Sequence, residues 1–468
     1  MKTAIANKAW FHDSDLRLDA SYHLSETVQI KHLFKISPYK FTVLSQQASD
    51  IFSGNIFKRI YVKDRNRGLP YLTGSDIIKS DIDSGKYISK KQANSLQRLI
   101  LKEGWILVTC SGTLGNVVYA DKLFEGRIAT HDLIRIIPNN KDVNNGFLYA
   151  YLASRYGFAL LTHSSYGGVV KHIEPHHIKS LPIPIFPIEK QKQIQDLIIQ
   201  SIELRVDANR LLIEAEELFE RGNNLSYETQ LLLRTENIYG NGASVKVSNK
   251  LVQTLKARHY SLRAQSIINK WNAVAGKPIH AWVTEEGLTR GMGGFFKRID
   301  GTKMNGMDII SQSDIHDRRP SYKKVRKSYI KETELAKTGM IIMPAAGTLG
   351  ENEVFLRPEL VYLNFEGKVL SEVVGKLRSK SLAEAAYLFV ALKSKPGFRI
   401  LRTLVYGTNL LYPRWDLIKD INIPCKDEQL LKSVSNLVIC AYEKRSVAKA
   451  KENQAIQLVE KEIDQWQN

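Results

Sequence analysis

The hydrophobic pattern divides the chain into short apolar runs and two long, uninterrupted amphipathic segments. Ile106–Thr109 and Ile341–Met343 are apolar, contain β-branched residues and are followed by glycine-containing turns. Runs of this length between turn-forming residues are typical of short buried strands. Such a strand-rich part with a few short helices occurs twice, and each time a long segment follows it. The pattern therefore predicts a mixed α+β fold with two long helices.

The long segments have the heptad pattern of paired helices. Residues 189–220 contain no glycine or proline, and their small and apolar residues recur at alternating spacings of three and four. In the second segment, residues 427–465, alanines recur every seven residues at the positions that match the small residues of the first. The residues that we expect to pair the helices are Leu197, Ser201, Leu204, Ala208, Leu211 and Ala215 in the first and Ala441, Ala448 and Ala455 in the second.

Small residues in alternate layers let two helix axes approach closely. We therefore expect the two helices to form an antiparallel coiled-coil pair with pseudo-twofold symmetry, which would place one globular domain at each end of the pair. The alternative is that each helix packs on its own globular domain instead.

Short motifs recur in the same order in both halves of the chain, at offsets between 235 and 240 residues. Six matches in one order at a nearly constant offset indicate two homologous halves of about 240 residues each. The matches are Phe57–Ile60 with Phe296–Ile299, Ser75–Ile77 with Ser313–Ile315, Gly112–Gly115 with Gly347–Gly350, Gly157-Phe158 with Gly397-Phe398, Tyr166-Gly167 with Tyr406-Gly407, and Ile183-Pro184 with Ile423-Pro424.

The domain edges follow from proline-marked segments at Leu181–Pro187 and Ile421–Pro424, because proline blocks the continuation of a helix. The expected domains are a first globular domain over 1–187, a first spacer helix over 188–222, a connector and second globular domain over 223–425, and a second spacer helix over 426–468.

The net charge of +19 indicates a polyphosphate partner. A membrane surface is the rival, but the sequence has no terminal polybasic block, no basic amphipathic helix and no apolar run long enough to span a bilayer. Met1–Asp19 is charged throughout and does not resemble a secretion signal. The three cysteines form no CxxC pair, as in a reduced intracellular protein. We therefore expect a cytoplasmic protein that binds nucleic acid and no membrane.

Two motifs resemble those of type I restriction-modification specificity subunits. The run Leu181–Gln191 is similar to the IPLPP-x-x-EQ junction that closes a target-recognition domain in that family, and Ser111–Gly115 is similar to its SGT-x-G turn. The second half departs from this pattern, since Ile423-Pro424 lacks the following prolines and Ala346 stands where the first half has Ser111.

The resemblance extends over nearly the whole chain and implies two target-recognition domains. Each would read one half of a bipartite double-stranded DNA target, with an unread gap set by the helices. The resemblance also implies docking onto two DNA methyltransferase (M) subunits and onto restriction (R) subunits. No cofactor is expected in this chain, while S-adenosylmethionine, ATP and Mg²⁺ are expected on the partner subunits.

Basic residues are the first set of candidate DNA contacts. The densest basic stretch, residues 316–331, has cations interleaved with tyrosines, and cations of this kind bind phosphates. Any one of them alone is an ordinary surface charge. The basic candidates are Lys58, Arg59, Lys63, Arg65, Arg67, Lys90, Lys91 and Lys171 in the first half and Lys297, Arg298, Arg318, Arg319, Lys323, Lys324, Arg326 and Lys327 in the second.

Glycine-containing loops are the second set. Glycine lets the backbone approach a ligand closely, and a threonine hydroxyl can donate to a phosphate or a base edge. An ordinary hairpin turn is the alternative on spacing alone, and the family resemblance favours the DNA contact. The loop candidates are Gly112, Thr113, Gly115, Tyr166 and Gly167 in the first half and Gly347, Thr348, Gly350, Tyr406 and Asn409 in the second.

The sequence lacks the motifs of nucleotide-binding, zinc-protease and amino-methyltransferase sites. Pro358-Glu359 with Glu366–Lys368 loosely imitates the carboxylate-bearing strand of an Mg²⁺-dependent nuclease, and the adjacent His176 and His177 have no third ligand nearby. We therefore expect no catalytic or metal site, and a non-catalytic, sequence-specific DNA-binding subunit. The alternatives are a single-chain enzyme that modifies or cleaves DNA and a coiled-coil scaffold without DNA specificity.

Overall fold

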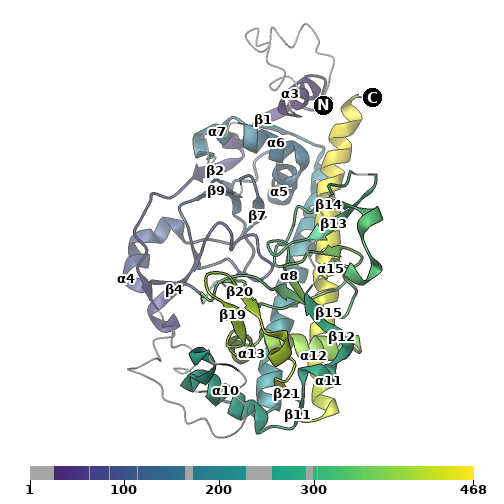
Figure 1. The fold of residues 1–468 in the computed structure, drawn as a ribbon. Coiled ribbons are helices and arrows are strands. Elements are labelled where there is room, and N and C mark those ends of the chain that lie inside the picture. The colour runs from purple at the N-terminus through teal and green to yellow at the C-terminus, as the bar shows by residue number, and fades with distance from the viewer. Residues whose placement is uncertain are drawn as a thin grey trace. The chain divides into compact units, whose positions relative to one another are not determined.

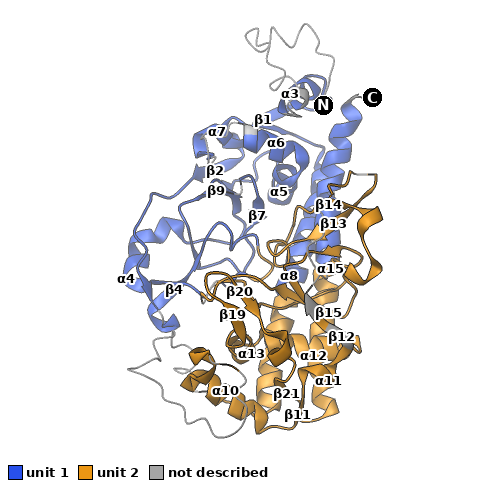
Figure 2. Cartoon of the chain, viewed as in Figure 1, with its two compact units in different colours: residues 1–78, 82–206, 447–468 blue, residues 79–81, 207–446 orange. Residues whose placement is uncertain are grey.

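The computed structural model describes residues 26–62, 64–83, 85–112, 114–163, 172–227, 254, 256–290, 299–302, 304–350 and 353–467. The chain forms two compact units (Figure 2). Unit 1 comprises residues 1–78, 82–206 and 447–468, and unit 2 comprises residues 79–81 and 207–446. Each unit thus contains a globular part and one portion of each long helix. The predicted mixed α+β fold is confirmed.

Unit 1 is built on two four-stranded sheets, with strand orders β2-β9-β6-β7 and β3-β5-β4-β8, and on the two-stranded ladder β1-β10. Its elements are α3 (Glu26–Lys35), β1 (Phe41–Val43), β2 (Ala48–Phe52), β3 (Tyr61–Val62), β4 (Gly68–Leu72), β5 (Tyr87–Ser89), α4 (Lys90–Ala93), β6 (Ile106–Thr109), β7 (Val117–Tyr119), β8 (Ile128–Ala129), β9 (Leu133–Pro138), α5 (Asn145–Ala153), α6 (Arg155–His163), α7 (Pro175–Lys179), β10 (Pro182–Pro184) and the start of α8 (Ile188–Gly222).

Unit 2 has a four-stranded sheet of order β12-β18-β15-β16, a three-stranded sheet β14-β13-β17, and the ladders β11-β21 and β19-β20. Its elements after α8 are α10 (Leu262–Asn272), β11 (Gly276–Pro278), α11 (Ile279–Trp282), β12 (Val283–Arg290), β13 (Gly306–Ile310), β14 (Lys323–Arg326), β15 (Met340–Pro344), β16 (Glu359–Leu360), β17 (Val369–Leu370), β18 (Val374–Ser379), α12 (Leu382–Lys393), α13 (Lys395–Leu401), β19 (Val405–Gly407), β20 (Leu411–Pro413), α14 (Trp415–Ile418), β21 (Asn422–Pro424) and the start of α15 (Glu428–Asp464).

The continuous apolar runs predicted as strands are buried on both faces of their sheets. In β6, Ile106 and Val108 point into one hydrophobic cluster while Leu107 points into another. In β15 of unit 2, Ile341 and Ile342 likewise enter different clusters. Because side chains alternate along a strand, a sheet between two cores requires apolar residues at every position. This explains why these strands have no polar alternation in the sequence.

The predicted duplication is visible in the strand pairing of the two units. Each has one parallel ladder in an otherwise antiparallel arrangement: Tyr71 pairs with Ile128 in unit 1, and Ile309 pairs with Val369 in unit 2. The antiparallel four-stranded sheets follow the same order of elements along the chain, and a helix pair, α5–α6 or α12–α13, follows each of them. The two halves therefore share one topology.

Two of the repeated motifs are explained by local structure. The Asp76 carboxylate accepts hydrogen bonds from the backbone and hydroxyl of Thr73 at 3.0 and 2.6 Å. Asp314 accepts the equivalent pair from Ser311 at 2.8 and 2.5 Å. The repeated serine-aspartate motif thus closes the same turn after β4 and after β13. The repeated Gly157 has another cause, since a Cβ there would lie 2.2 Å from the Tyr151 carbonyl of the preceding helix.

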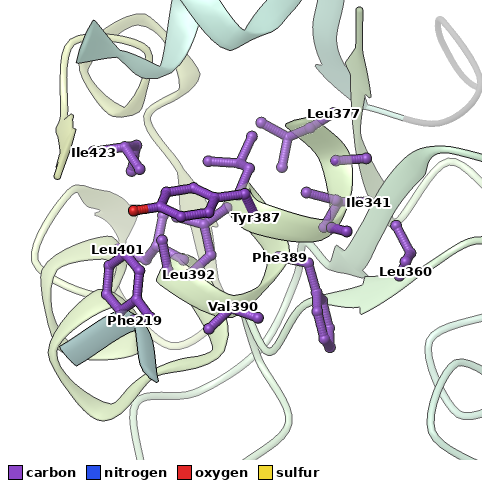
Figure 3. Packing of buried hydrophobic residues seen from close by; sticks show 14 of the residues in the cluster. Phe219, Ile341, Leu360, Leu377, Tyr387, Phe389, Val390, Leu392, Leu401 and Ile423 are labelled. Atoms are coloured by element: carbon purple, nitrogen blue, oxygen red, sulfur yellow. The ribbon is translucent and has the colours of Figure 1, made fainter. Parts of the chain in front are cut away.

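In unit 2, α12 forms the centre of the hydrophobic core (Figure 3). Tyr387 is stacked on Trp282 with ring centroids 5.4 Å apart, and its ring lies 5.5 Å from that of Phe219 at the end of α8. Its hydroxyl donates to the Pro424 carbonyl at 2.8 Å. The core of unit 2 thus joins its globular part, the proline-marked segment before α15 and the end of α8.

The two long helices, α8 and α15, are antiparallel where they meet in each unit (Figure 1). In unit 1, Lys190 near the start of α8 pairs with Glu462 near the end of α15, and the Ser201 hydroxyl donates to the Ala448 carbonyl at 2.7 Å. In unit 2, Lys444 pairs with Asp207 at 3.2 Å. Residue numbers rise along one helix as they fall along the other, so the predicted antiparallel pairing is confirmed.

Among the residues expected to pair the helices, the small ones and Leu211 are buried, whereas Leu197 and Leu204 are only partly buried. Ile198 and Ile202 are buried instead, in the cluster that contains α5. The buried stripe is therefore wider than a two-position heptad stripe, because each helix packs on its own globular part as well as on the other helix. The two packing arrangements weighed from the sequence as alternatives occur together.

In the described part of the chain, no helix has the length and hydropathy that a membrane span requires.

Candidate nucleic-acid interface

The GTLG motif of unit 1 lies in the hairpin that joins β6 to the antiparallel β7. Gly112 and Gly115 have positive φ angles of 72° and 77°. The Gly115 N–H donates to the Thr109 carbonyl at 2.9 Å, and a Cβ at Gly115 would lie 2.7 Å from a Thr162 methyl group. Both glycines are therefore required by the turn itself. Thr113, the expected donor between them, lies outside the described residues.

Each GTLG motif is hydrogen-bonded to a loop segment much later in its half of the chain. In unit 1, Ser111 forms an isolated antiparallel bridge with His172, directly after the Tyr166-Gly167 segment, which lies outside the described residues together with Lys171. In unit 2, Gly347 forms the equivalent bridge with Leu411, with N–O distances of 3.1 and 2.9 Å. In unit 2, the GTLG motif and the hairpin that carries the Tyr406-Gly407 motif, which were predicted independently, thus lie side by side.

In unit 2 this places the β19–β20 hairpin beside the GTLG turn. Tyr406, Asn409 and Leu410 are exposed at the hairpin tip. Thr348 and Gly350 are exposed in the turn, and the Arg402 guanidinium donates to their carbonyls at 3.2 and 2.8 Å. The combined surface exposes a hydroxyl, an amide, a phenol and an apolar side chain. The polar groups can form hydrogen bonds with base edges and phosphates, and the apolar side chain can contact a thymine methyl group.

In unit 1 the exposed cations Lys58 and Arg59 lie on a segment that is held in place by Gln92 of α4. The Ile60 N–H donates to the Gln92 amide oxygen at 2.8 Å, and the Gln92 amide nitrogen donates to the Lys58 carbonyl. Ile56 and Ile60 on the same segment are 85% and 53% exposed. Exposed apolar side chains between cations suit contact with the thymine methyl group and the sugar-phosphate backbone.

The remaining basic candidates of unit 1 differ in their exposure and in their ion pairs with acidic residues of the same unit. Arg65 pairs with Asp83 at 3.0 Å. Arg67 lies 3.5 Å from a carboxylate oxygen of Asp64, and its side chain is 82% exposed. Lys90 and Lys91 are exposed in the first turn of α4. Lys63 lies outside the described residues.

In unit 2, Lys323, Arg326 and Lys327 are exposed on and directly after β14. The other candidates of this stretch have protein partners or are half-buried. Lys324 pairs with Asp308 at 2.7 Å, and the Arg318 guanidinium donates to the Lys79 carbonyl at 2.8 Å. Arg319 is half-buried, and Lys297 and Arg298 lie outside the described residues.

Asp308 shows the electrostatic effect of this basic surface. Burial raises the pKa of its carboxyl, but the hydrogen bonds and charges of Lys324 and Lys368 outweigh burial and leave the pKa below its ordinary value. The carboxylate therefore stays charged and neutralises part of the basic stretch, so Lys323, Arg326 and Lys327 are the better candidates for phosphates.

The carboxylates that imitate a nuclease strand do not converge. Glu359 is buried, accepts a hydrogen bond from the Tyr442 hydroxyl at 2.6 Å and lies 3.6 Å from the Arg445 guanidinium. Glu366 accepts a hydrogen bond from the Thr338 hydroxyl at 2.5 Å. Over the residues that the structure describes, no group of three or more His, Cys, Asp or Glu side chains is placed to hold a metal ion. His177 instead accepts from the Glu174 N–H at the start of α7.

Sequence reasoning missed the turn between β8 and β9, residues 130–132, and the buried Arg135 that holds it. It also missed Gln92. Each is a single polar residue without a motif around it, and only the apposition of β8, β9 and the segment before β3 places them near Arg59. No sequence signal could have identified them.

Comparison with known proteins gives one family. Residues 25–214 match the family model of the type I restriction modification DNA specificity domain. No curated protein matches the chain.

The chain is also similar to solved structures. One is the S subunit of a type I restriction-modification system from M. genitalium, with 11% identity, 92% of this chain and 96% of that chain covered, and a TM-score of 0.35. Another is the HsdS subunit from Thermoanaerobacter tengcongensis, with 14% identity, coverage of 91% and 97%, and a TM-score of 0.29. A third comes from work on the complex assembly and conformational transition of the type I R-M system, with 13% identity, coverage of 92% and 97%, and a TM-score of 0.28.

Proposed function

Residues 25–214 belong to the family of type I restriction modification DNA specificity domains, and from this premise we propose that the whole chain is the DNA sequence specificity subunit of a type I restriction-modification system. The observation that carries the proposal is the repetition of the fold. The family match ends at residue 214, yet unit 2 repeats the sheet order and the single parallel ladder of unit 1. One chain thus carries two domains of the same kind.

Two such domains suit a bipartite double-stranded DNA target. The target-recognition domains comprise residues 1–187 and 223–425, and each reads one half of the target through its loops. Base edges are read by the GTLG turn and the loop bridged to it, which is the Tyr406–Asn409 hairpin in the second domain. The exposed cations bind phosphates and supply affinity that falls steeply with salt.

The long helices set the unread gap between the two half-sites. A helix of about 35 residues spans roughly 50 Å at ~1.5 Å per residue, which corresponds to about 15 base pairs. The buried small residues Ser201 and Ala448, joined by a 2.7 Å hydrogen bond, support a close and rigid helix pair. The outer faces of the helices dock two methyltransferase subunits, and the restriction subunits join that assembly.

The chain itself contributes recognition and no chemistry. S-adenosylmethionine, ATP and Mg²⁺ are held by the partner subunits, and the complex acts on DNA in the cytoplasm. The burial of Glu359 against Tyr442 supports the absence of nuclease chemistry in this chain. The carboxylate that would have to hold Mg²⁺ in a nuclease is buried in the core and hydrogen-bonded to Tyr442.

The test is to express the chain with the methyltransferase subunit of its system in a host that lacks such systems, and to map genomic methylation. One bipartite motif with an unspecific gap is expected, and it should be absent when either protein is omitted. The proposal is wrong if methylation does not depend on this chain. It is also wrong if the purified chain alone, given Mg²⁺ or S-adenosylmethionine, cleaves or methylates plasmid DNA.

A further inference from the structure

The turn between β8 and β9 of unit 1 is held by an arginine that is completely buried. The Arg135 guanidinium donates to the carbonyls of Ala129 and Thr130 at 2.9 and 3.0 Å and to the carbonyl of Leu133 at 3.0 Å. The Leu133 N–H closes the turn on the His131 carbonyl at 2.8 Å. The Arg135 side chain therefore fixes backbone carbonyls both before His131 and after Asp132.

Burying a guanidinium among backbone carbonyls is costly, because desolvation opposes its charge. Burial lowers the pKa of Arg135 to about 10, so the group is still a cation at neutral pH. The effect of this arrangement is to fix the backbone of the turn. Residues 130–132 cannot shift without breaking hydrogen bonds to a buried charge, and their side chains are held as a rigid group.

Three side chains form a chain of contacts across this turn. The Arg59 guanidinium lies 3.5 Å from Nδ1 of His131, and Nε2 of His131 lies 3.4 Å from a carboxylate oxygen of Asp132. A guanidinium can only donate, so Nδ1 accepts and the neutral ring carries its proton on Nε2, facing Asp132. The imidazole therefore separates a donor from an acceptor and orients both.

Arg59 is also held at its base, so its outer edge is presented in one orientation. Its Nε donates to the hydroxyl of the buried Tyr71 at 2.7 Å, and its guanidinium lies 5.8 Å from the ring centroids of Phe57 and Tyr71. The hydrogen bond to Tyr71 raises the pKa of Arg59, although burial lowers it. Arg59 is exposed, and the side chain of Asp132 is 43% exposed.

We propose that Arg59 and Asp132 form a base-reading pair of unit 1 in addition to the GTLG turn, with Arg59 donating to O6 and N7 of a guanine and Asp132 accepting the amino group of a cytosine or adenine. This inference rests on the DNA specificity function proposed above and assigns its chemistry to named side chains. Arginine is the donor best matched to the guanine edge, and a carboxylate accepts the exocyclic amino group. His131 and Arg135 are positioning residues, since they act through Arg59 and Asp132.

Unit 2 does not repeat this arrangement. The register of the sheets places Ser371, Glu372 and Val373 in the equivalent turn, where unit 1 has Thr130, His131 and Asp132. Lys376 occupies the third position of β18, as Arg135 does in β9, and donates instead to the Thr333 carbonyl at 2.9 Å. The two units thus carry different groups in this turn, whereas Arg298, which matches Arg59 in the repeated motif, lies outside the described residues.

The experiment uses the assembled methyltransferase and compares variants by the methylation of a library of target sites. Asp132→Asn and Arg59→Met should each reduce the discrimination at one base pair by about 10- to 100-fold. That base pair should lie in the half-site read by unit 1, and the other half-site should be unchanged. The matched control is Glu125→Gln, which removes an exposed carboxylate from the turn before β8, at the other end of the strands of unit 1.

A chemical probe tests the Arg59 contact directly. Replacing the guanine read by Arg59 with 7-deazaguanine should weaken methylation by the wild-type complex about 10-fold. The same replacement should have no further effect on Arg59→Met, because a methionine side chain has no N–H to donate to N7. His131→Gln, whose amide can still accept and donate, should retain the motif, and His131→Ala should relax it. A purely structural role for His131 would lower complex yield without changing base preference.

Two failures can be told apart. A wild-type complex that leaves no bipartite motif overturns the proposed function. A wild-type motif that persists with the same discrimination in both Asp132→Asn and Arg59→Met overturns the base-reading pair alone, as does a change confined to the half-site read by unit 2.

Discussion

The two units hold a partly buried arginine of a long helix at equivalent places, with side chains 15% and 13% exposed, but they neutralise it in different ways. In unit 1, Arg205 of α8 pairs at 2.7 Å with Glu452 of α15, which also accepts a hydrogen bond from Tyr149. In unit 2, Arg445 of α15 lies 3.6 Å from Glu359, a residue of β16. The buried charge is thus balanced across the helix pair in one unit and by the recognition fold in the other.

This difference shows that a duplicated fold keeps its topology while its polar contacts diverge. The strand order and the turn caps at Asp76 and Asp314 are the same in both units. The groups that neutralise buried charge and the groups on the turns beside the candidate DNA surface are not. Topology depends on hydrophobic patterning, which tolerates substitution, whereas a polar contact is lost with one residue.

The largest expected effect is the loss of the carboxylate that pairs with Arg205. Glu452→Ala leaves a buried guanidinium without its partner and should lower the free energy of unfolding of unit 1 by about 3–5 kcal/mol. Hydrogen exchange should show faster exchange in α5, which carries Tyr149, and unchanged exchange in α12 of unit 2. The control is Arg205→Leu combined with Glu452→Gln, which removes both charges, keeps an acceptor for Tyr149 and should be much less destabilising. Equal acceleration in α5 and α12 would remove the distinction between the units.

The helix pair itself should respond alike in both units. Ala448 in unit 1 and Ala441 in unit 2 are completely buried, so Ala448→Leu and Ala441→Leu should each destabilise the pair by about 1–3 kcal/mol through overpacking. Denaturant unfolding measures the change. Ala450→Leu, on the exposed face of α15, is the control and should change stability by less than about 0.5 kcal/mol. Tolerance of leucine at either buried position would contradict the close helix approach.

A third, pH-dependent effect should be confined to unit 2. Burial raises the pKa of Glu359, but the hydrogen bond with His316, the charge of Arg445 and the Tyr442 hydroxyl together hold it below its ordinary value. The lowered pKa contributes stability that is present above the pKa of an unfolded glutamate, ~4.3, and is lost as the pH falls through the folded value.

Glu359→Gln keeps an acceptor for Tyr442 but removes the charge, and should cost about 1–2 kcal/mol at pH 7. The difference from the wild type should shrink as the pH falls below about 4. Unfolding curves measured from pH 7 to pH 3 test this. A difference that stays constant over that range would show that the charge of Glu359 does not stabilise unit 2.

The smallest expected effect concerns the exposed cations. Arg67→Gln in unit 1 and Arg326→Gln in unit 2 should each weaken DNA binding equally for all sequences and reduce the slope of log K against log salt by about 1. The methylation motif should not change. Lys102→Gln, an exposed cation that is not among the candidate DNA contacts, serves as control. A change of base preference in Arg67→Gln would assign that residue to the base edge instead.

The sequence by itself determined the duplication, the α+β class, the long helices and their antiparallel pairing through small residues, and it carried the resemblance to the specificity-subunit family. These depend on periodicity and on repeated motifs, which are properties of the chain order. It also indicated both loop motifs, although not that Gly347 would be bridged to Leu411.

Only the tertiary structure decided which polar residues meet. Arg205 and Glu452 are separated by most of the second repeat, and Arg59 reaches His131 only because the segment before β3 packs against the β8–β9 turn. The partial burial of Leu197 and Leu204 has the same origin. Each helix packs both on the other helix and on a globular part, and the hydrophobic pattern of the sequence does not separate these two contacts. A hydrogen bond depends on distances of a few tenths of an ångström between atoms brought together by folding, and no spacing along the chain encodes them.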